Sequence, residues 1–174
     1  MFAPMLGNKA SLLGTLGIGL DHSINSSLSW QKTAATKPRE YAPFGPLTVT
    51  VTGGLYLTEN PVLGLTDTGV DNAQLLFSEA GVPSSTNPNV AVYINTANKV
   101  TLSVTNPGNV KLTSFNASTG AFTGQFTLKD APAAPRTVKF QGQLVATESR
   151  GYGYFLLPQL AAPSPILSGR VVLE

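Results

Sequence analysis

The sequence predicts an all-β protein, and three observations carry that prediction. The last third of the chain, from Phe115 to Glu174, places one strand-like stretch after another with turns between them. Leu47-Thr-Val-Thr-Val-Thr52 alternates apolar and hydroxyl side chains with the two-residue period of a strand. No stretch of the chain shows a convincing helical period. Short strands without helices indicate an all-β class.

Glycines inside successive strands favour a strongly curved sheet. Gly124 stands between Phe122 and Phe126, and Gly142 stands between Phe140 and Leu144. Glycine relieves crowding where strands bend. We therefore expect one domain over residues 1–174, an antiparallel meander curved into a barrel or a partly closed barrel. A two-sheet β-sandwich is the alternative.

The first part of the chain supplies strands of mixed quality. Gly14, Gly17 and Gly19 make the stretch 11–20 a poor helix and a better strand. Prolines predict a loop over 33–46, and Gly53-Gly54 interrupts the strand that begins at Leu47. The expected strands cover 11–20, 28–30, 47–52, 55–57, 72–78, 90–94 and 99–104.

The second part is more regular, with proline-containing loops between the strands. Asn106-Pro-Gly-Asn109 is a turn in which Pro107 presets φ and Gly108 accepts a positive φ. In 151–157, Phe155 and Leu157 face one side, and Tyr152, Tyr154 and Leu156 face the other. Both faces are largely apolar, so we expect this strand to be covered on both sides. The expected strands cover 110–115, 121–128, 137–144, 151–157 and 166–173.

The composition favours an exported protein with a polar, weakly charged surface. Hydrophobic residues make up 42% of the 174 residues and charged residues only 11%, against about 25% in a typical protein. Net charge is +2 and the densest basic cluster is Lys37-Pro-Arg39, so no patch for nucleic acid is predicted. The chain has no cysteine, which excludes disulfides.

The sequence contains no stretch of about 18 apolar residues, so we expect no membrane-spanning helix. Met1-Phe-Ala-Pro-Met-Leu6 lacks the basic start and long apolar run of a secretory signal. If the protein is exported, we expect its signal to lie upstream or to have been cut off. The expected location is extracellular or at the cell surface.

Five segments resemble, in order, the motifs of one family. They are Gly7-Asn-Lys-Ala-Ser-Leu-Leu-Gly14 with Leu28-Ser-Trp-Gln-Lys32, then Phe115-Asn-Ala-Ser-Thr-Gly-Ala-Phe-Thr-Gly-Gln-Phe126, Val138-Lys-Phe-Gln-Gly142 and Arg150-Gly-Tyr-Gly-Tyr-Phe-Leu156. This pattern is similar to that of a C-terminal β-rich module of large secreted proteins from environmental bacteria, which has no assigned activity. The resemblance covers nearly the whole chain and implies export. It also implies that the chain is the C-terminal part of a larger protein. Thr33 departs from the family's usual proline.

No motif predicts catalysis. His22 is the only histidine. Asp21 is adjacent, but side chains next to each other in sequence point in different directions, so a hydrolytic triad is not indicated. No G-x-S-x-G motif is present. A glycosidase needs two carboxylates that converge on one bond, and nothing in the sequence places two of the acidic residues together. We expect a protein that is not an enzyme and that needs no cofactor.

Two sets of residues are candidates for ligand binding. Asp67-Thr-Gly-Val-Asp71 is the best candidate for a cation site, with two carboxylates and backbone oxygens in a turn. It offers far fewer oxygens than the six to eight that calcium takes, so we expect no metal site. Trp30, Tyr152 and Tyr154 are candidates for a sugar platform or pocket, although aromatic residues at strand spacing more often belong to a core. Asn25-Ser-Ser and Asn116-Ala-Ser match the glycosylation sequon, which is common by chance.

These observations favour a non-catalytic structural, adhesive or assembly module of a bacterial extracellular or cell-surface protein. Its expected partners are neighbouring domains or protein subunits, including further copies of itself. The first alternative is a β-barrel that binds a glycan or small molecule, since barrels of this size can hold one ligand. The second alternative is a hydrolase.

Overall fold

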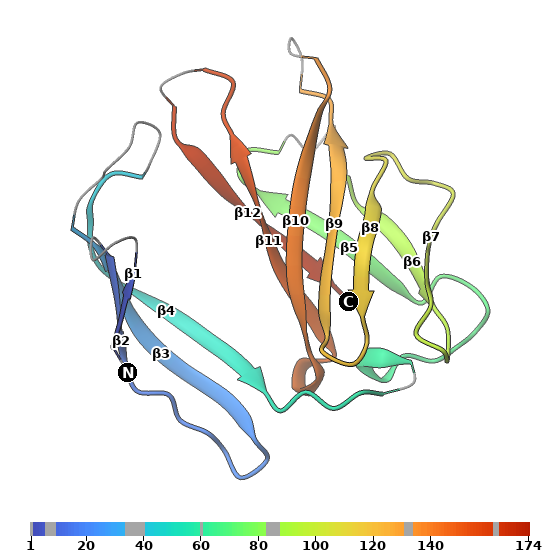
Figure 1. The fold of residues 1–174 in the computed structure, drawn as a ribbon, viewed down its shortest axis with the longest axis horizontal. Helices are drawn as coiled ribbons and strands as arrows, with labels where there is room; N and C mark the ends of the chain where they lie inside the picture. Colours follow the sequence, from blue (N-terminus) through green and yellow to red (C-terminus); the bar gives the residue numbers. More distant parts are fainter. Residues whose placement is uncertain are drawn as a thin grey trace. The chain divides into compact units, whose positions relative to one another are not determined.

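The described part of the chain is an all-β structure of antiparallel strands, which confirms the all-β prediction. The computed structural model describes residues 2–5, 10–33, 41–59, 61–82, 88–130, 134–161 and 164–174. Within these ranges the only helical segments are short 3₁₀ turns at Val62–Gly64 and Ala146–Glu148. The strands (Figure 1) are β1 Phe2–Met5, β2 Ala10–Gly14, β3 Ser23–Lys32, β4 Phe44–Gly54, β5 Ala73–Glu79, β6 Val90–Ile94, β7 Val100–Leu102, β8 Lys111–Asn116, β9 Ala121–Leu128, β10 Arg136–Val145, β11 Arg150–Pro158 and β12 Ile166–Leu173.

The strands belong to two compact units. The smaller unit comprises Met1–Leu55 with Gln159–Ile166, and the larger comprises Tyr56–Pro158 with Leu167–Glu174. Each has its own sheet. The expectation of one domain over residues 1–174 stays a prediction.

The smaller unit is a four-stranded sheet in the order β1-β2-β3-β4. In β4, half-buried Val49 and Val51 alternate with exposed threonines, as the sequence predicts, and Leu28 of β3 pairs with Val49 and is buried. Leu47, expected on the same apolar face, is 51% exposed. Because β4 ends the sheet, Pro46 can lie inside it without removing a hydrogen bond that an inner strand would need.

The larger unit is an eight-stranded antiparallel sheet in the order β7-β6-β5-β12-β11-β10-β9-β8. Strands β8 to β12 form an unbroken meander, and the C-terminal strand β12 joins that meander to β5, where Val171 pairs with Phe77. The sheet curves until it is nearly closed into a barrel. The predicted curved meander and partly closed barrel are therefore confirmed.

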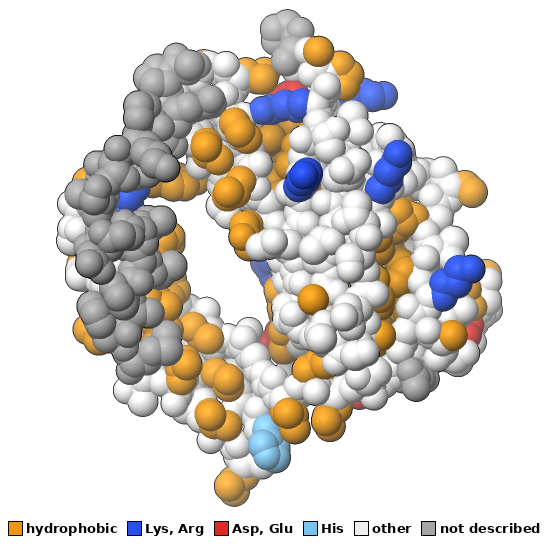
Figure 2. All heavy atoms as spheres, viewed as in Figure 1, with side chains coloured by type: hydrophobic (Ala, Val, Ile, Leu, Met, Phe, Trp, Pro, Cys, Tyr) orange, Lys and Arg blue, Asp and Glu red, His pale blue; other side chains and the backbone are white. Residues whose placement is uncertain are grey.

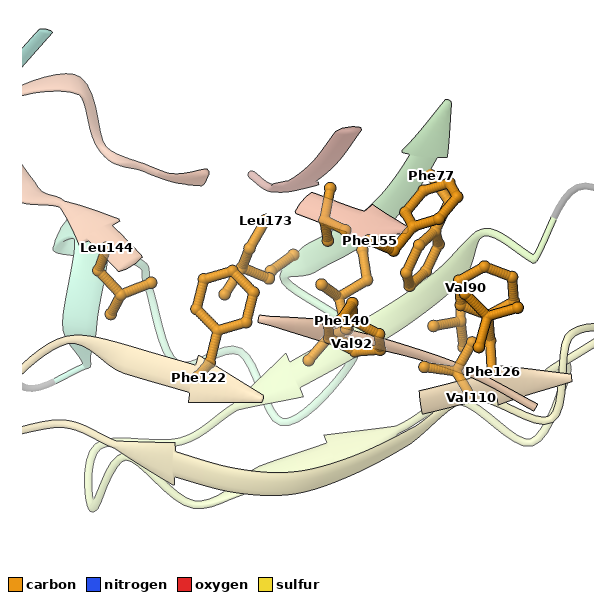
Figure 3. Close-up of a cluster of buried hydrophobic side chains, with 14 of the residues drawn as sticks. Phe77, Val90, Val92, Val110, Phe122, Phe126, Phe140, Leu144, Phe155 and Leu173 are labelled. Atoms are coloured by element: carbon orange, nitrogen blue, oxygen red, sulfur yellow. The ribbon is translucent and has the colours of Figure 1, made fainter. Parts of the chain in front are cut away.

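Phenylalanine rings fill the interior of this sheet. Figure 3 shows them turned toward one another from β5, β9, β10 and β11. The ring centroid of Phe77 is 4.8 Å from that of Phe126 and 5.1 Å from that of Phe140, and Phe126 meets Phe155 at 5.2 Å in a T-shaped contact. Each of these rings is at most 3% exposed. The interior is thus packed with side chains drawn from both halves of the sheet order.

Glycines on neighbouring strands make room for these rings. Gly142 pairs directly with Phe122, and a Cβ added there would lie 2.2 Å from the ring's Cζ. Gly124 pairs with Phe140, with a corresponding distance of 2.4 Å. A ring can lie over its cross-strand partner only where that partner has no side chain. This arrangement gives the strand glycines the structural role that the sequence pattern predicts.

Several predicted boundaries were wrong. No strand resumes at 55–57, because the chain leaves the sheet after Gly54 and the Tyr56 hydroxyl donates a hydrogen bond to the carbonyl of Ala117 at 2.6 Å. Strand β2 ends at Gly14, and of the expected strand beyond it only an isolated bridge from Ile18 to Ile24 remains. Strand β7 is shorter than the expected 99–104. Part of the predicted 33–46 loop, residues 34–40, lies outside the described residues, and β4 begins before that loop was expected to end.

The turn before β8 forms as predicted, but for a different reason. The amide of Asn109 donates to the carbonyl of Asn106 at 3.0 Å, and the positive φ belongs to Asn109. Gly108 has no positive φ; a Cβ there would lie 2.3 Å from the Cβ of buried Pro88. The close approach of Pro88 to the backbone therefore explains why position 108 is a glycine.

Strand β11 is buried on only one face. Phe155 and Leu157 point into the core and are 1% and 2% exposed. Tyr154 and Leu156 point the other way and are 46% and 54% exposed. The predicted division of residues between the two faces is right, and the expected cover on both faces is wrong for the described chain.

Candidate functional site

The side chains of β8 to β11 that point away from the core form a mostly polar surface, which we call the outer face. The two-residue period of a strand separates them from the buried phenylalanines. The outer face consists of Lys111, Thr113, Thr123, Gln125, Lys139, Gln141, Gln143, Tyr152, Tyr154 and Leu156.

Strand register arranges the outer face in rows that cross the strands. In the first row Gln125 pairs with Lys111 on one side and with Lys139 on the other. In the second row Gln141 pairs with Thr123 and with Tyr154. In the third row Gln143 pairs with Tyr152. Directly paired residues on one face lie about 5 Å apart, so each row presents a continuous line of groups.

The outer face is hollowed along the second row. One shallow depression of about 530 Å³ is lined by residues from all four strands, including Lys139 and Leu156. A second, of about 420 Å³, lies beside it over Gln143 and Tyr152. The two share Thr123, Gln141 and Tyr154. Together they form an open trough whose floor is the sheet.

Hydrogen bonds hold the polar side chains of the trough in place. The Gln141 amide donates to the Tyr154 hydroxyl at 2.7 Å, and the hydroxyls of Thr113 and Thr123 are 2.9 Å apart. The hydroxyl end of Tyr154 is therefore held in place, while its ring remains exposed to solvent. A ring held in this way loses little conformational freedom when a ligand stacks on it.

Tyr152 is fixed by charged neighbours. Its hydroxyl donates to the carboxylate of Glu148, and that bond raises the pKa of Tyr152 above its ordinary value. The guanidinium of Arg170 lies 5.6 Å from the ring centroid, within cation–π range. Tyr152 is therefore a more enclosed ring than Tyr154.

The charge of the outer face is positive. Lys111 and Lys139 are exposed and form no ion pair with a described residue. The carboxylates that flank these strands in the chain are engaged: Glu148, before β11, with Tyr152, and Asp130, after β9, with Arg136. Figure 2 shows Lys and Arg side chains on a largely uncharged surface over β8 to β10.

Trp30, the third aromatic candidate, lies in the other unit. It stands in β3 and packs against Phe44 in a T-shaped contact at 4.9 Å. Its indole Nε1 is buried and has no hydrogen-bond partner among the described residues. The structure thus groups Tyr152 with Tyr154 in one unit and gives Trp30 a packing contact in the other. A ligand-binding role for the three residues stays a prediction.

The described surroundings of His22 contain no catalytic arrangement. His22 is exposed at a turn with φ of 62°, and its amide donates to the carbonyl of Gly19 at 2.9 Å. Asp21 accepts hydrogen bonds from the hydroxyl and amide of Ser23, which lower the pKa of its carboxyl group. The carboxylate that a triad would need is thus used to close the turn.

Asp67 stabilises a loop. Its carboxylate accepts from the Tyr93 hydroxyl at 2.6 Å and from the Thr96 amide at 3.0 Å. These bonds lower the pKa of Asp67, and the same contact raises the pKa of Tyr93. Asp71 instead borders a depression of about 390 Å³ beside Glu174. Within the described ranges, no group of three or more His, Cys, Asp or Glu side chains is placed to hold a metal ion.

The sequon residue Asn116 is engaged in its own turn. Its side-chain oxygen accepts from the amides of Ser118 and Thr119, which closes the β8–β9 connection. Asn25 is exposed within β3. These hydrogen bonds account for an asparagine at position 116 without a role in glycosylation.

Sequence reasoning missed most of the outer face. Its amide, hydroxyl and lysine side chains occupy every second position of β8 to β10, and that alternation was visible in Lys139-Phe-Gln-Gly-Gln143. By itself, this alternation indicates only which side of each strand faces the core. Register was needed to show that these positions align with Tyr152 and Tyr154.

Among the described residues, no helix has the length and apolar character required to cross a membrane. When the chain is compared with protein-family models, curated proteins and solved structures, no match is found.

Proposed function

We propose that this protein is a non-catalytic adhesive or assembly module of a bacterial protein that is exported to the cell surface or the extracellular space. It works by presenting the outer face of β8 to β11 to a partner. The resemblance of its motifs to a C-terminal module of secreted bacterial proteins supports export, as do its low charge and lack of cysteine.

One observation carries this proposal: an ordered trough lies on the open side of a fully packed sheet. On the core side of β11, Phe155 is 1% exposed, whereas on the trough side Tyr154 is 46% exposed. A large aromatic side chain that is pinned yet exposed suits a contact surface, since tyrosine is enriched at the energetic centres of interfaces. The bulk of the sheet then serves as a rigid support.

The alternative of a ligand inside the barrel has less support. The rings of Phe77, Phe126, Phe140 and Phe155 occupy the interior of the larger unit. A small molecule would have to displace packed side chains. A glycan site is better placed on the outer face, where the trough contains both tyrosines. A hydrolase has the least support, because Asp21 and Asp67 are engaged in loop hydrogen bonds.

Two measurements test the proposal. Cell fractionation of the producing bacterium, with an antibody against this chain, should find the protein outside the cytoplasm. Purified chain should bind washed cells of that bacterium in flow cytometry, and Tyr154→Ala should reduce the binding while Tyr41→Ala, in the smaller unit, should not. A cytoplasmic protein, or equal binding by both variants, would contradict the proposal. So would turnover of glycans or esters that is lost on changing His22.

A further inference from the structure

We propose that the outer face binds an anionic polysaccharide, carboxylated or sulfated, lying in the trough. This inference rests on the proposed function and names its partner. The site unites exposed aromatic, amide, hydroxyl and ammonium groups in the larger unit.

The polar groups of the trough match those of a sugar. Gln141, Gln143 and Thr123 offer side-chain donors and acceptors, and a sugar hydroxyl is itself both donor and acceptor. The ring of Tyr154 adds an apolar surface on which the C–H face of a sugar can stack. Because the trough is open to solvent, it can accommodate part of a long polymer. A closed pocket would instead select the end of a chain or a small molecule.

The charge pattern selects a polyanion. Lys111 and Lys139 lie in one row with Gln125 between them, so their backbones are separated by two strand spacings, about 10 Å. Positive charges at intervals along a row favour a ligand that carries negative charges at intervals. The neighbouring carboxylates of Glu148 and Asp130 are already bonded, so they oppose an anion less than free carboxylates would.

A polysaccharide fits the trough better than nucleic acid does. Nucleic-acid surfaces that track a phosphate backbone rely on dense arrays of Lys and Arg. Here the rows also contain uncharged Gln and Thr side chains, and the chain's net charge is only +2. The face therefore combines a small number of charges with many groups for hydroxyl recognition.

The test measures binding of the full chain to defined polymers by isothermal titration calorimetry. The probes are polygalacturonate, its methyl-esterified form, dextran sulfate, unmodified dextran and single-stranded DNA. We expect binding to at least one anionic polysaccharide, with the charged polymer preferred over its neutral counterpart. Comparison of polygalacturonate with dextran sulfate separates a carboxylated from a sulfated ligand.

Matched variants locate the site. Lys111→Gln and Lys139→Gln should each weaken binding about two- to fivefold, as expected for exposed charge pairs. Tyr154→Ala should weaken it about fivefold or more, as expected for the truncation of a central aromatic contact. Lys111 pairs with Gln125 within the outer face, whereas Lys99 is exposed before β7 and outside that face, so Lys99→Gln removes the same charge and should leave affinity unchanged.

The outcomes separate this inference from the proposed function. No binding to any polysaccharide, or equal weakening by Lys99→Gln and Lys139→Gln, would overturn the inference. Tighter binding to DNA that is insensitive to Tyr154→Ala would also overturn it, by indicating a general anion surface. If Tyr154→Ala still abolishes binding to cells while all polymers fail, the proposed function survives and only its polysaccharide partner is wrong.

Discussion

Replacing Gly142 by alanine should destabilise the larger unit by about 1–3 kcal/mol, the usual cost of overpacking a core. The new Cβ would lie 2.2 Å from Cζ of Phe122 and 2.7 Å from its Cε1 and Cε2. Ordinary contact begins near 3.4 Å, so the ring must retreat by more than about 1 Å. Phe122 is 1% exposed and has little space into which to move.

The assay is urea unfolding followed by far-UV circular dichroism. Fluorescence is the wrong probe for this variant, because the only tryptophan, Trp30, lies in the smaller unit. Gly53→Ala is the control, since its Cβ would meet only Ile24, at 4.0 Å, without a positive φ. That change should leave stability unaltered or raise it by about 0.4–1 kcal/mol through the unfolded state.

A second substitution tests the physical reason. Phe122→Leu removes the ring that the methyl group introduced by Gly142→Ala would strike, so the double variant should lose less stability than the sum of the two single variants. The expected coupling is about 1 kcal/mol, within the range for side chains in contact. A Gly142→Ala variant within about 0.5 kcal/mol of the wild type, or strict additivity, would refute the account of glycines beneath rings.

Phe155→Ala should cost about 3–5 kcal/mol, whereas Leu156→Ala on the outer face should cost less than about 1 kcal/mol in urea unfolding; equal losses would contradict one-sided burial. The lowered pKa of Asp67 stabilises the fold above the ordinary value of 3.8, and this contribution disappears as pH falls through the lowered folded value. Asp67→Asn should therefore reduce stability at neutral pH and match the wild type in acid; a pH-independent difference would argue against the Tyr93 contact. If residues 1–174 form one domain, Trp30 fluorescence and circular dichroism should report coincident unfolding; two separate transitions would show two domains.

The alternation in the sequence was sufficient to predict much of the larger unit. Strand β9 has the predicted bounds, and its buried positions are those assigned from Phe122, Gly124, Phe126 and Leu128. Strands β6 and β12 also have the predicted bounds. These segments are predictable because one face is buried, and burial imposes a two-residue period on the residue types.

Long-range hydrogen bonds could not be predicted in the same way. The Asn98 side chain accepts from the Val62 amide at 2.7 Å and donates to the Glu59 carbonyl at 2.9 Å, across more than 30 residues of sequence. Asn72 similarly bonds to both backbone groups of Ile94. A single asparagine carries no sequence signal for such a distant partner. These amides show one use of the polar, weakly charged composition: they fix loops by bonding to backbone groups.

The outer face could be predicted only in part from the sequence. Its alternating polar side chains were readable in Thr123, Gln125, Lys139 and Gln141, but their alignment with Tyr154 depends on register between strands. Exposure was also misjudged: the apolar appearance of both faces of β11 indicated two-sided cover, although Tyr154 remains 46% exposed. A tyrosine can serve either a core or a contact surface, so residue type alone could not decide.

The most direct test of the central claim is an NMR titration of ¹⁵N-labelled full chain with fragments of the anionic polysaccharide that binds best. We expect shift changes to concentrate on β8 to β11, in particular at Thr123, Gln141 and Tyr154, and to saturate with ligand. Amides of β5 and β6 should remain unchanged. Saturable changes confined to β5–β7 or to the smaller unit would contradict the claim that the outer face is the functional surface.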